Sequence, residues 1–123
     1  MLFDTDVIIW ALRGNARAAA AIDGADSLEL SVVSYMELVR SARDKRELHS
    51  TKTTLANLDF QMLPLSENIG HRASVYLEEY ALKSNLGIPD ALIAATAVES
   101  GQPLCTAKDY RNIAELALKV FRP

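Results

Sequence analysis

Residues 1–10 read Met1-Leu2-Phe3-Asp4-Thr5-Asp6-Val7-Ile8-Ile9-Trp10, and they indicate the fold class most clearly. Its three leading apolar residues predict a short buried strand, and the polar triplet Asp4-Thr5-Asp6 is typical of a helix start. The apolar residues that follow continue the helix until Gly14-Asn15 ends it. A strand that leads directly into a helix indicates an α/β unit, with Asp4 at the carboxyl end of the strand.

Strand and helix patterns continue to alternate along the chain. We expect further strands at 28–33, 60–65, 103–105 and 118–121, and further helices at 16–22, 34–41, 43–57, 66–84 and 89–99. Ser34 is the expected N-cap of its helix, with Glu37 completing a capping box. Pro64 predicts that its strand lies at an edge or ends early. The predicted fold class is α/β, a three-layer α/β/α sandwich around a parallel sheet, and residues 1–123 form one domain.

The composition is that of an ordinary globular protein. Half of the residues are apolar and 24% are charged, and no apolar run approaches the roughly 20 residues of a membrane span. We find no export signal, and the single cysteine, Cys105, fits a reducing compartment, so we expect a cytoplasmic protein. The net charge of −3 does not indicate a passive nucleic-acid binder. A site built from carboxylates, however, makes a nuclease more acidic than such a binder.

Three of the sixteen acidic residues, Asp4, Glu37 and Asp90, lie among apolar neighbours. Each by itself could be a helix cap, because each lies at or near the start of a predicted helix. A charge in such surroundings costs free energy unless it is paired or bound to a metal. All three can gather at one end of the sheet, where oxygen-only ligands suit Mg²⁺ or Mn²⁺. The two histidines, His49 and His71, lie in polar stretches, and we expect them at the surface rather than on zinc.

Three stretches carry a family resemblance: Leu2-Phe3-Asp4-Thr5-Asp6-Val7-Ile8-Ile9, Ser31-Val32-Val33-Ser34-Tyr35-Met36-Glu37-Leu38 and Ile88-Pro89-Asp90-Ala91-Leu92-Ile93-Ala94-Ala95-Thr96-Ala97. In order and spacing they resemble the PIN-domain nucleases, and most of all the VapC-type toxins of toxin–antitoxin operons. This resemblance implies that Asp4, Glu37 and Asp90 are catalytic acids that bind Mg²⁺ or Mn²⁺. It also implies an endoribonuclease that hydrolyses RNA phosphodiester bonds through metal-activated water.

The resemblance implies a fourth acidic or amide position in the stretch Leu104-Cys105-Thr106-Ala107-Lys108-Asp109-Tyr110. This chain is two residues shorter there than the family pattern. Asp109 is therefore either a slipped fourth catalytic and metal-binding residue, which we favour, or the polar half of a pair with Tyr110. Thr106 and Asp6 are expected to orient the ligands rather than to bind the metal directly.

The same resemblance implies partners. These are an RNA substrate, a cognate antitoxin that holds the enzyme inactive, and a second copy of the chain in a homodimer. The apolar residues Leu48, Leu55 and Leu58 could form the antitoxin groove or the dimer face, or belong to the core.

Basic residues are concentrated just beyond Glu37. Arg40, Arg43 and Arg46 could form a rim that holds the RNA backbone. A solvated helix face, balanced by neighbouring acids, explains the same pattern equally well.

Three other functions remain as alternatives. The Asp4-Thr5-Asp6 triplet also follows the first strand of Asp-dependent phosphatases, although such enzymes usually have longer chains. A phosphoacceptor receiver domain would use Asp4 and Asp6 with Asp59 as the acceptor and Lys108 as the cation. A catalytically inactive PIN fold would act as a binding partner only.

Overall fold

Strands and helices alternate along the whole chain in the computed structural model, which describes residues 1–123. The elements are β1 (Leu2–Phe3), α1 (Thr5–Leu12), α2 (Ala16–Asp23), β2 (Glu29–Ser31), α3 (Val32–Ser41), α4 (Lys45–Asn57), β3 (Gln61–Leu63), α5 (Glu67–Ser84), α6 (Ile88–Ser100), β4 (Leu104–Thr106) and β5 (Leu118–Val120). Each strand and helix expected from the sequence is present, with ends shifted by a few residues. The predicted α/β class is confirmed.

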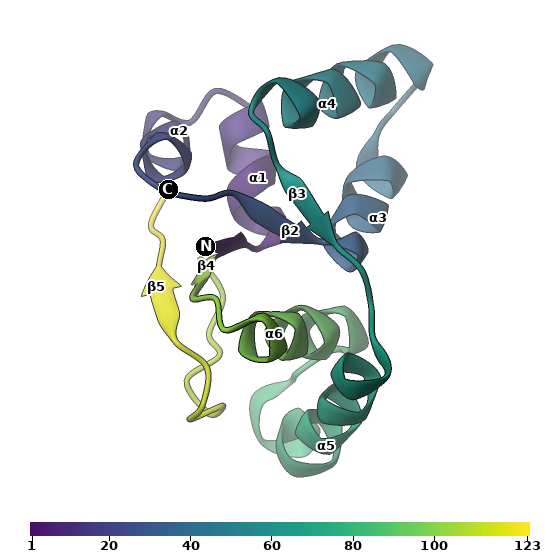
Figure 1. Cartoon of the computed structure of the whole chain (residues 1–123), viewed down its shortest axis with the longest axis vertical. Coiled ribbons are helices and arrows are strands. Elements are labelled where there is room, and N and C mark those ends of the chain that lie inside the picture. The colour runs from purple at the N-terminus through teal and green to yellow at the C-terminus, as the bar shows by residue number, and fades with distance from the viewer.

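The five strands form one parallel sheet in the order β3-β2-β1-β4-β5 (Figure 1). From the central strand β1 the chain builds β2 and β3 on one side, and later β4 and β5 on the other. The junction of β1 and β4 is therefore the switch point of the sheet, where α/β proteins place their ligands. β3 lies at an edge and ends just before Pro64, as the sequence predicts.

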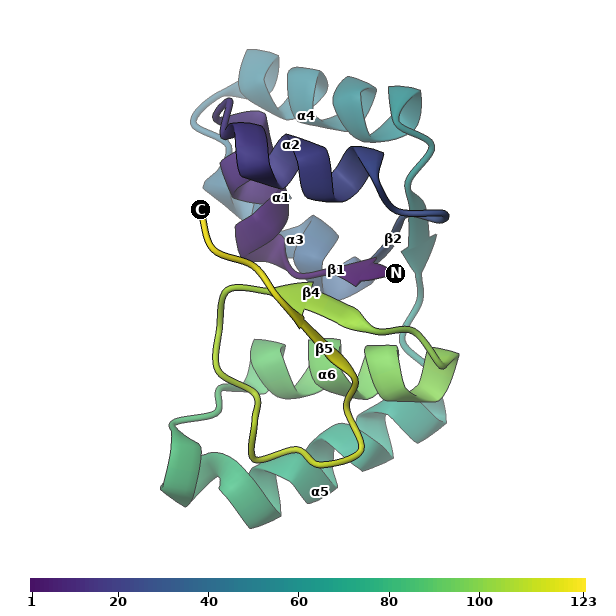
Figure 2. The same cartoon turned by 90° about the vertical axis from the view of Figure 1, so that its left-hand side faces the viewer.

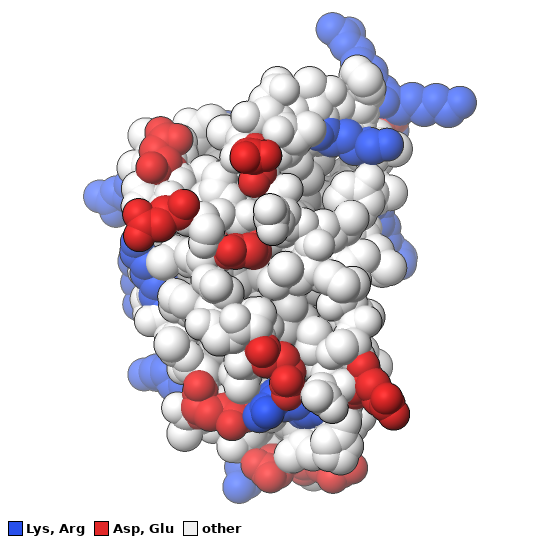
Figure 3. Space-filling model, viewed as in Figure 1, with Lys and Arg blue, Asp and Glu red and all other residues white.

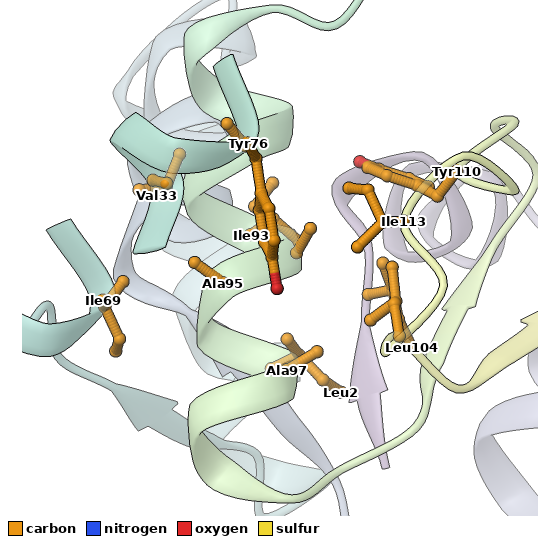
Figure 4. Close-up of a cluster of buried hydrophobic side chains, with 14 residues drawn as sticks. Leu2, Val33, Ile69, Tyr76, Ile93, Ala95, Ala97, Leu104, Tyr110 and Ile113 are labelled. Carbon is orange, nitrogen blue, oxygen red and sulfur yellow. The ribbon is translucent and has the colours of Figure 1, made fainter. Parts of the chain in front are cut away.

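The sheet separates two apolar cores. Because side chains alternate along a strand, Leu2 and Leu104 point into one core whereas Phe3 and Cys105 point into the other. Helices α5 and α6 cover the first core, and α1, α2 and α4 lie on the opposite side of the sheet (Figure 2). Figure 4 shows the first core, where Leu2 and Leu104 face side chains from α6. The three-layer arrangement follows from this alternation.

Helix α3 begins three residues earlier than its capping pattern suggests. The N-cap is Ser31, whose hydroxyl accepts a hydrogen bond from Val33 N at 3.0 Å. The prediction of Ser34 as N-cap is wrong, because the extended backbone of the N-cap position falls at the last residue of β2. Ser34 is fully buried inside the helix, and its hydroxyl has no hydrogen-bond partner. Glu37 consequently takes no part in a capping box.

Cys105 and the two histidines lie where the sequence predicts them. Cys105 is buried as a small apolar residue, and burial raises the pKa of its thiol. His49 and His71 are both exposed, as predicted. None of the six helices combines the length and apolar character needed to cross a membrane.

The buried leucine of β4 provides a test of the packing. Leu104 has no exposed surface, whereas Leu82 on α5 is fully exposed. We expect Leu104→Ala to lower the free energy of unfolding by about 2–5 kcal/mol, because it leaves a cavity beside the central strand. Leu82→Ala should change it by less than about 0.5 kcal/mol. Urea denaturation measures both, and equal losses in the two variants would contradict this packing.

Candidate active site

The three predicted acids lie at the carboxyl edge of the sheet. Asp4 directly follows β1, Glu37 is in the second turn of α3, and Asp90 is in the first turn of α6. The partial positive charge at the start of α6 favours a carboxylate at Asp90. The segment that leaves β4 passes the same edge, beside the switch point. The topology therefore gathers residues from four separate parts of the chain.

Asp4 is fully buried, and both of its carboxylate oxygens are hydrogen-bonded. Oδ1 accepts from Thr5 N at 2.8 Å, so Asp4 caps α1. Oδ2 accepts from the Thr106 hydroxyl at 2.7 Å and from the Tyr110 hydroxyl at 3.1 Å. These donors are neutral, and no cationic side chain bonds to this carboxylate. Asp4 is thus a buried charge without a direct counter-charge, although hydrogen bonds satisfy it.

Tyr110 connects Asp4 to Asp90. Its ring is buried in the core shown in Figure 4, and its hydroxyl lies 3.1 Å from Asp4 Oδ2 and 3.4 Å from Asp90 Oδ1. Burial, together with the negative charges of Asp4 and Asp90, raises the pKa of Tyr110 well above its usual value. The phenol therefore stays protonated and acts as a donor. Since both carboxylates share this hydroxyl, they lie within two hydrogen-bond lengths of each other.

Thr5 connects Asp4 to Glu37 in a similar way. The Thr5 hydroxyl donates to Glu37 Oε1 at 2.7 Å, while its backbone N–H donates to Asp4 Oδ1. Packing of α1 against α3 brings the two residues together, and Glu37 remains half-buried. The structure thus joins Asp4, Glu37 and Asp90 into one hydrogen-bonded group.

Asp6 and Thr106 hold the segment after β4 against this group. Asp6 Oδ2 accepts from Ala107 N at 3.1 Å, and Thr106 donates to Asp4. Burial, and then the charge of Asp4, raises the pKa of Asp6 to about 6. Thr106 therefore bonds to Asp4 directly, whereas Asp6 bonds to the backbone beside Thr106. That these two residues orient metal ligands stays a prediction.

Lys108 joins the site, although the sequence suggested it only for the phosphoacceptor alternative. Its Nζ donates to Asp90 Oδ1 at 2.8 Å. Burial lowers the pKa of Lys108, but the bond to Asp90 and the charges of Asp4, Asp90 and Asp6 outweigh this effect and raise it. No sequence signal indicated that Lys108 or Tyr110 bonds to the acids; both simply follow the strand at the switch point.

Asp109 is not brought to the other acids. Its carboxylate is exposed and binds Arg111, with both pairs of atoms 2.9 Å apart. The side-chain bond to Arg111 lowers the pKa of Asp109 to about 2. Over the short connection from Thr106 to Tyr110, Lys108 takes the inner position and Asp109 points to solvent. This placement does not favour a slipped fourth ligand.

The remaining candidates form no hydrogen bond or ion pair with the three acids. Arg40, Arg43 and Arg46 are exposed, and Figure 3 shows basic side chains projecting at the upper right, over the end where α3 leads into α4. Arg43 pairs with Glu47 at 2.9 Å. Asp59 precedes β3 and so lies at the opposite edge of the sheet from Asp4. The phosphoacceptor alternative is therefore wrong, because its acceptor is not at the site.

The donor set fits a hard divalent cation in chemistry, but the side chains are not arranged around one. Every acidic donor is a carboxylate oxygen, which Mg²⁺ and Mn²⁺ prefer. The buried charge of Asp4 has no cation bonded to it. No three His, Cys, Asp or Glu side chains lie close enough together to hold a metal as they stand. Binding at this site would therefore require the acids to move closer together.

Comparison with known proteins finds one matching family and several solved structures of similar fold. The family model described as PIN domain matches residues 1–119. The chain is similar to a solved toxin–antitoxin complex from Klebsiella pneumoniae, with 28% identity, a TM-score of 0.79 and 94% of each chain covered. It is also similar to FitAcB from Neisseria gonorrhoeae, with 25% identity, a TM-score of 0.73, and 95% of this chain and 94% of that one covered.

A third solved structure, VapBC2 from Rickettsia felis bound to a DNA fragment from its promoter, is 18% identical. Its TM-score is 0.80, and 97% of this chain and 96% of that one are covered, so it supports the fold. No curated protein matches the chain significantly.

The hydroxyl shared by Asp4 and Asp90 can be tested by stability. Tyr110→Phe keeps the buried ring but removes a hydrogen bond to a buried carboxylate, so we expect a loss of about 1–3 kcal/mol in the free energy of unfolding. The matched control is Tyr35→Phe, because the Tyr35 hydroxyl forms no hydrogen bond and its ring is half-buried. Chemical denaturation in EDTA compares the two. A Tyr110→Phe variant as stable as Tyr35→Phe would show that this hydroxyl does not support Asp4.

Proposed function

The chain belongs to the PIN-domain family, and from this we propose that it is a divalent-metal-dependent endoribonuclease, the toxin of a type II toxin–antitoxin pair. The observation that carries the proposal is the group formed by Asp4, Glu37 and Asp90. Three acids from separate parts of the chain share Thr5 and Tyr110 as hydrogen-bond partners at the switch point of the sheet. The family suggests action on nucleic acid, and RNA is our choice of substrate.

In the proposed site Asp4, Glu37 and Asp90 would hold Mg²⁺ or Mn²⁺. A bound divalent ion would polarise the scissile phosphate and lower the pKa of attacking water. The chain's own contribution is to fix the acids: Thr106 and Tyr110 donate to Asp4, and Thr5 donates to Glu37. Such outer contacts keep a carboxylate in one orientation and exclude water from its far side. Asp109 is not included in this site because its exposed carboxylate forms an ion pair with Arg111.

Arg40, Arg43 and Arg46 are proposed to bind the RNA backbone. Arg43 lines a cavity of about 500 Å³ between α1, α3 and α4, together with Arg13 and polar side chains. Lysine and arginine neutralise phosphates with little regard to sequence, which suits a rim rather than a reading site. The ion pair with Glu47 offsets part of the charge of Arg43 and is the main observation against this role.

The proposed antitoxin has a candidate groove on the opposite side of the sheet from α5 and α6. A cavity of about 270 Å³ between α1, α2 and α4 is lined mainly by apolar side chains, among them Leu12, Ile22, Leu55, Leu58 and Phe60. Leu48 is not part of it. The similar structure from Klebsiella pneumoniae is a toxin–antitoxin complex, which supports a protein partner for this chain as well.

We also propose a homodimer. Trp10 on α1 and Met36 and Val39 on α3 are large apolar side chains that remain exposed. Helices α1 and α3 pack against each other, so a second copy of the chain could cover the exposed apolar side chains of both helices.

Neutral variants of the acids test the proposed activity. We expect Asp4→Asn and Asp90→Asn to lower the rate of Mn²⁺-dependent RNA cleavage by at least about 100-fold. Loss of an outer contact of a metal site already costs 10–100-fold, and loss of a ligand should cost more. The matched control is Asp109→Asn, which removes an exposed carboxylate near the site and should retain the wild-type rate. Circular dichroism checks that each variant is folded.

The same experiment separates the remaining alternatives. A wild-type protein that cleaves RNA no faster than Asp4→Asn would support the inactive PIN fold. If Asp109→Asn lost as much activity as Asp90→Asn, Asp109 would belong to the site despite its contact with Arg111.

The basic rim is tested by binding in the Asp4→Asn background, so that cleavage does not interfere. Charge reversal in Arg43→Glu/Arg46→Glu should weaken binding of single-stranded RNA. For two phosphate contacts, the slope of log affinity against log salt should become about 1.4 less steep. Arg122→Glu, an exposed residue near the end of the chain, is the control. Unchanged affinity and slope, measured by fluorescence anisotropy, would leave these arginines as a solvated helix face.

A further inference from the structure

Lys108 is the cationic side chain bonded to the group of acids. Its ammonium lies 2.8 Å from Asp90 Oδ1. The other donor near that oxygen is the Tyr110 hydroxyl, which has a single proton and lies closer to Asp4, at 3.1 Å, than to Asp90, at 3.4 Å. The ammonium is therefore the firmer partner of Asp90. The protein itself supplies a counter-charge to one of the proposed metal ligands.

The backbone of Lys108 is fixed, whereas its side chain is free to move. Lys108 N donates to the Thr106 hydroxyl at 3.0 Å, and the same hydroxyl donates to Asp4. The preceding residue, Ala107, is bonded to Asp6. The side chain beyond this anchor is 43% exposed, and that of Asp90 is 25% exposed. The ammonium can therefore leave Asp90 for solvent without any change in the backbone.

We propose that Lys108 is an internal counter-ion of the acidic group, which a divalent cation must displace from Asp90 in order to bind. This inference rests on the proposed function only in taking Asp90 as a metal ligand. Bound to Asp90, a divalent cation would face the ammonium at a distance where like charges repel strongly. The two cations therefore compete for one carboxylate, and the displaced ammonium stays at the mouth of the site.

Metal binding without RNA tests this competition. Mn²⁺ is titrated into the wild-type chain, Lys108→Met and Lys108→Gln, and free Mn²⁺ is followed by electron paramagnetic resonance. We expect both variants to bind Mn²⁺ about fivefold more tightly than the wild type. A change of this size is expected when the metal no longer has to break one partly exposed ion pair. The rise in melting temperature on replacing EDTA by Mn²⁺ should also be larger in the variants.

Two controls isolate the charge. Lys108→Arg keeps a cation beside Asp90 and should stay within twofold of the wild-type affinity. Lys52→Met removes an exposed lysine on α4 that makes no ion pair, and it should also stay within twofold. If Lys108→Met folds only with Mn²⁺ present, this supports the proposal, because the acids then need another cation. In that case Lys108→Arg, which keeps the cation, should fold with or without Mn²⁺.

Equal or weaker Mn²⁺ binding by Lys108→Met and Lys108→Gln would overturn the proposal, as would no binding by any form. If Lys108→Met and Lys108→Gln bound Mn²⁺ and the wild type did not, the proposal would be supported. Failure of the proposed function is a separate result, because it is measured as RNA cleavage. A chain with the expected Mn²⁺ affinities but no nuclease activity would keep the counter-ion and lose the enzyme.

Discussion

The carboxylate of Asp4 is buried at the carboxyl end of the central strand, and groups from three parts of the chain hold it. Thr5 binds it from α1, Thr106 from the end of β4, and Tyr110 from the segment beyond. A buried carboxylate is costly unless its oxygens are satisfied. The switch point of the sheet therefore has to be built around this side chain. Glu37 and Asp90 enter the same network one hydrogen bond further out.

Gathering these acids at one edge of the sheet costs stability. Burial and the charge of Asp4 raise the pKa of Asp6 to about 6, so proximity opposes its ionised form. Ser34, three residues before Glu37 on α3, is also buried, and its hydroxyl has no hydrogen-bond partner. Lys108 offsets part of the negative charge by bonding to Asp90. A chain selected for stability alone would separate such groups. The excess of carboxylates over the one ammonium is consistent with the cation site that we propose.

Much of the fold could be predicted because its signals are local. Alternating apolar strands and helical patterns located all five strands, and Pro64 indicated an edge. The N-cap of α3 was misjudged because Ser31 and Ser34 carry the same side chain. Only the end of β2 decides which of them has the extended backbone. Asp4, Glu37 and Asp90 were identifiable since a charge among apolar residues is conspicuous in the sequence itself.

Local patterns in the sequence were enough to predict the order of elements, the parallel sheet and the three candidate acids. Which side chains contact these acids is known only from the folded chain. Tyr110 bridges Asp4 and Asp90, Lys108 bonds to Asp90, and Asp109 turns away to Arg111. The physical reason is that a hydrogen bond or ion pair depends on direction over a few ångströms. In the short connection after β4, neighbouring residues point to opposite sides, and only the folded chain fixes which one faces inward.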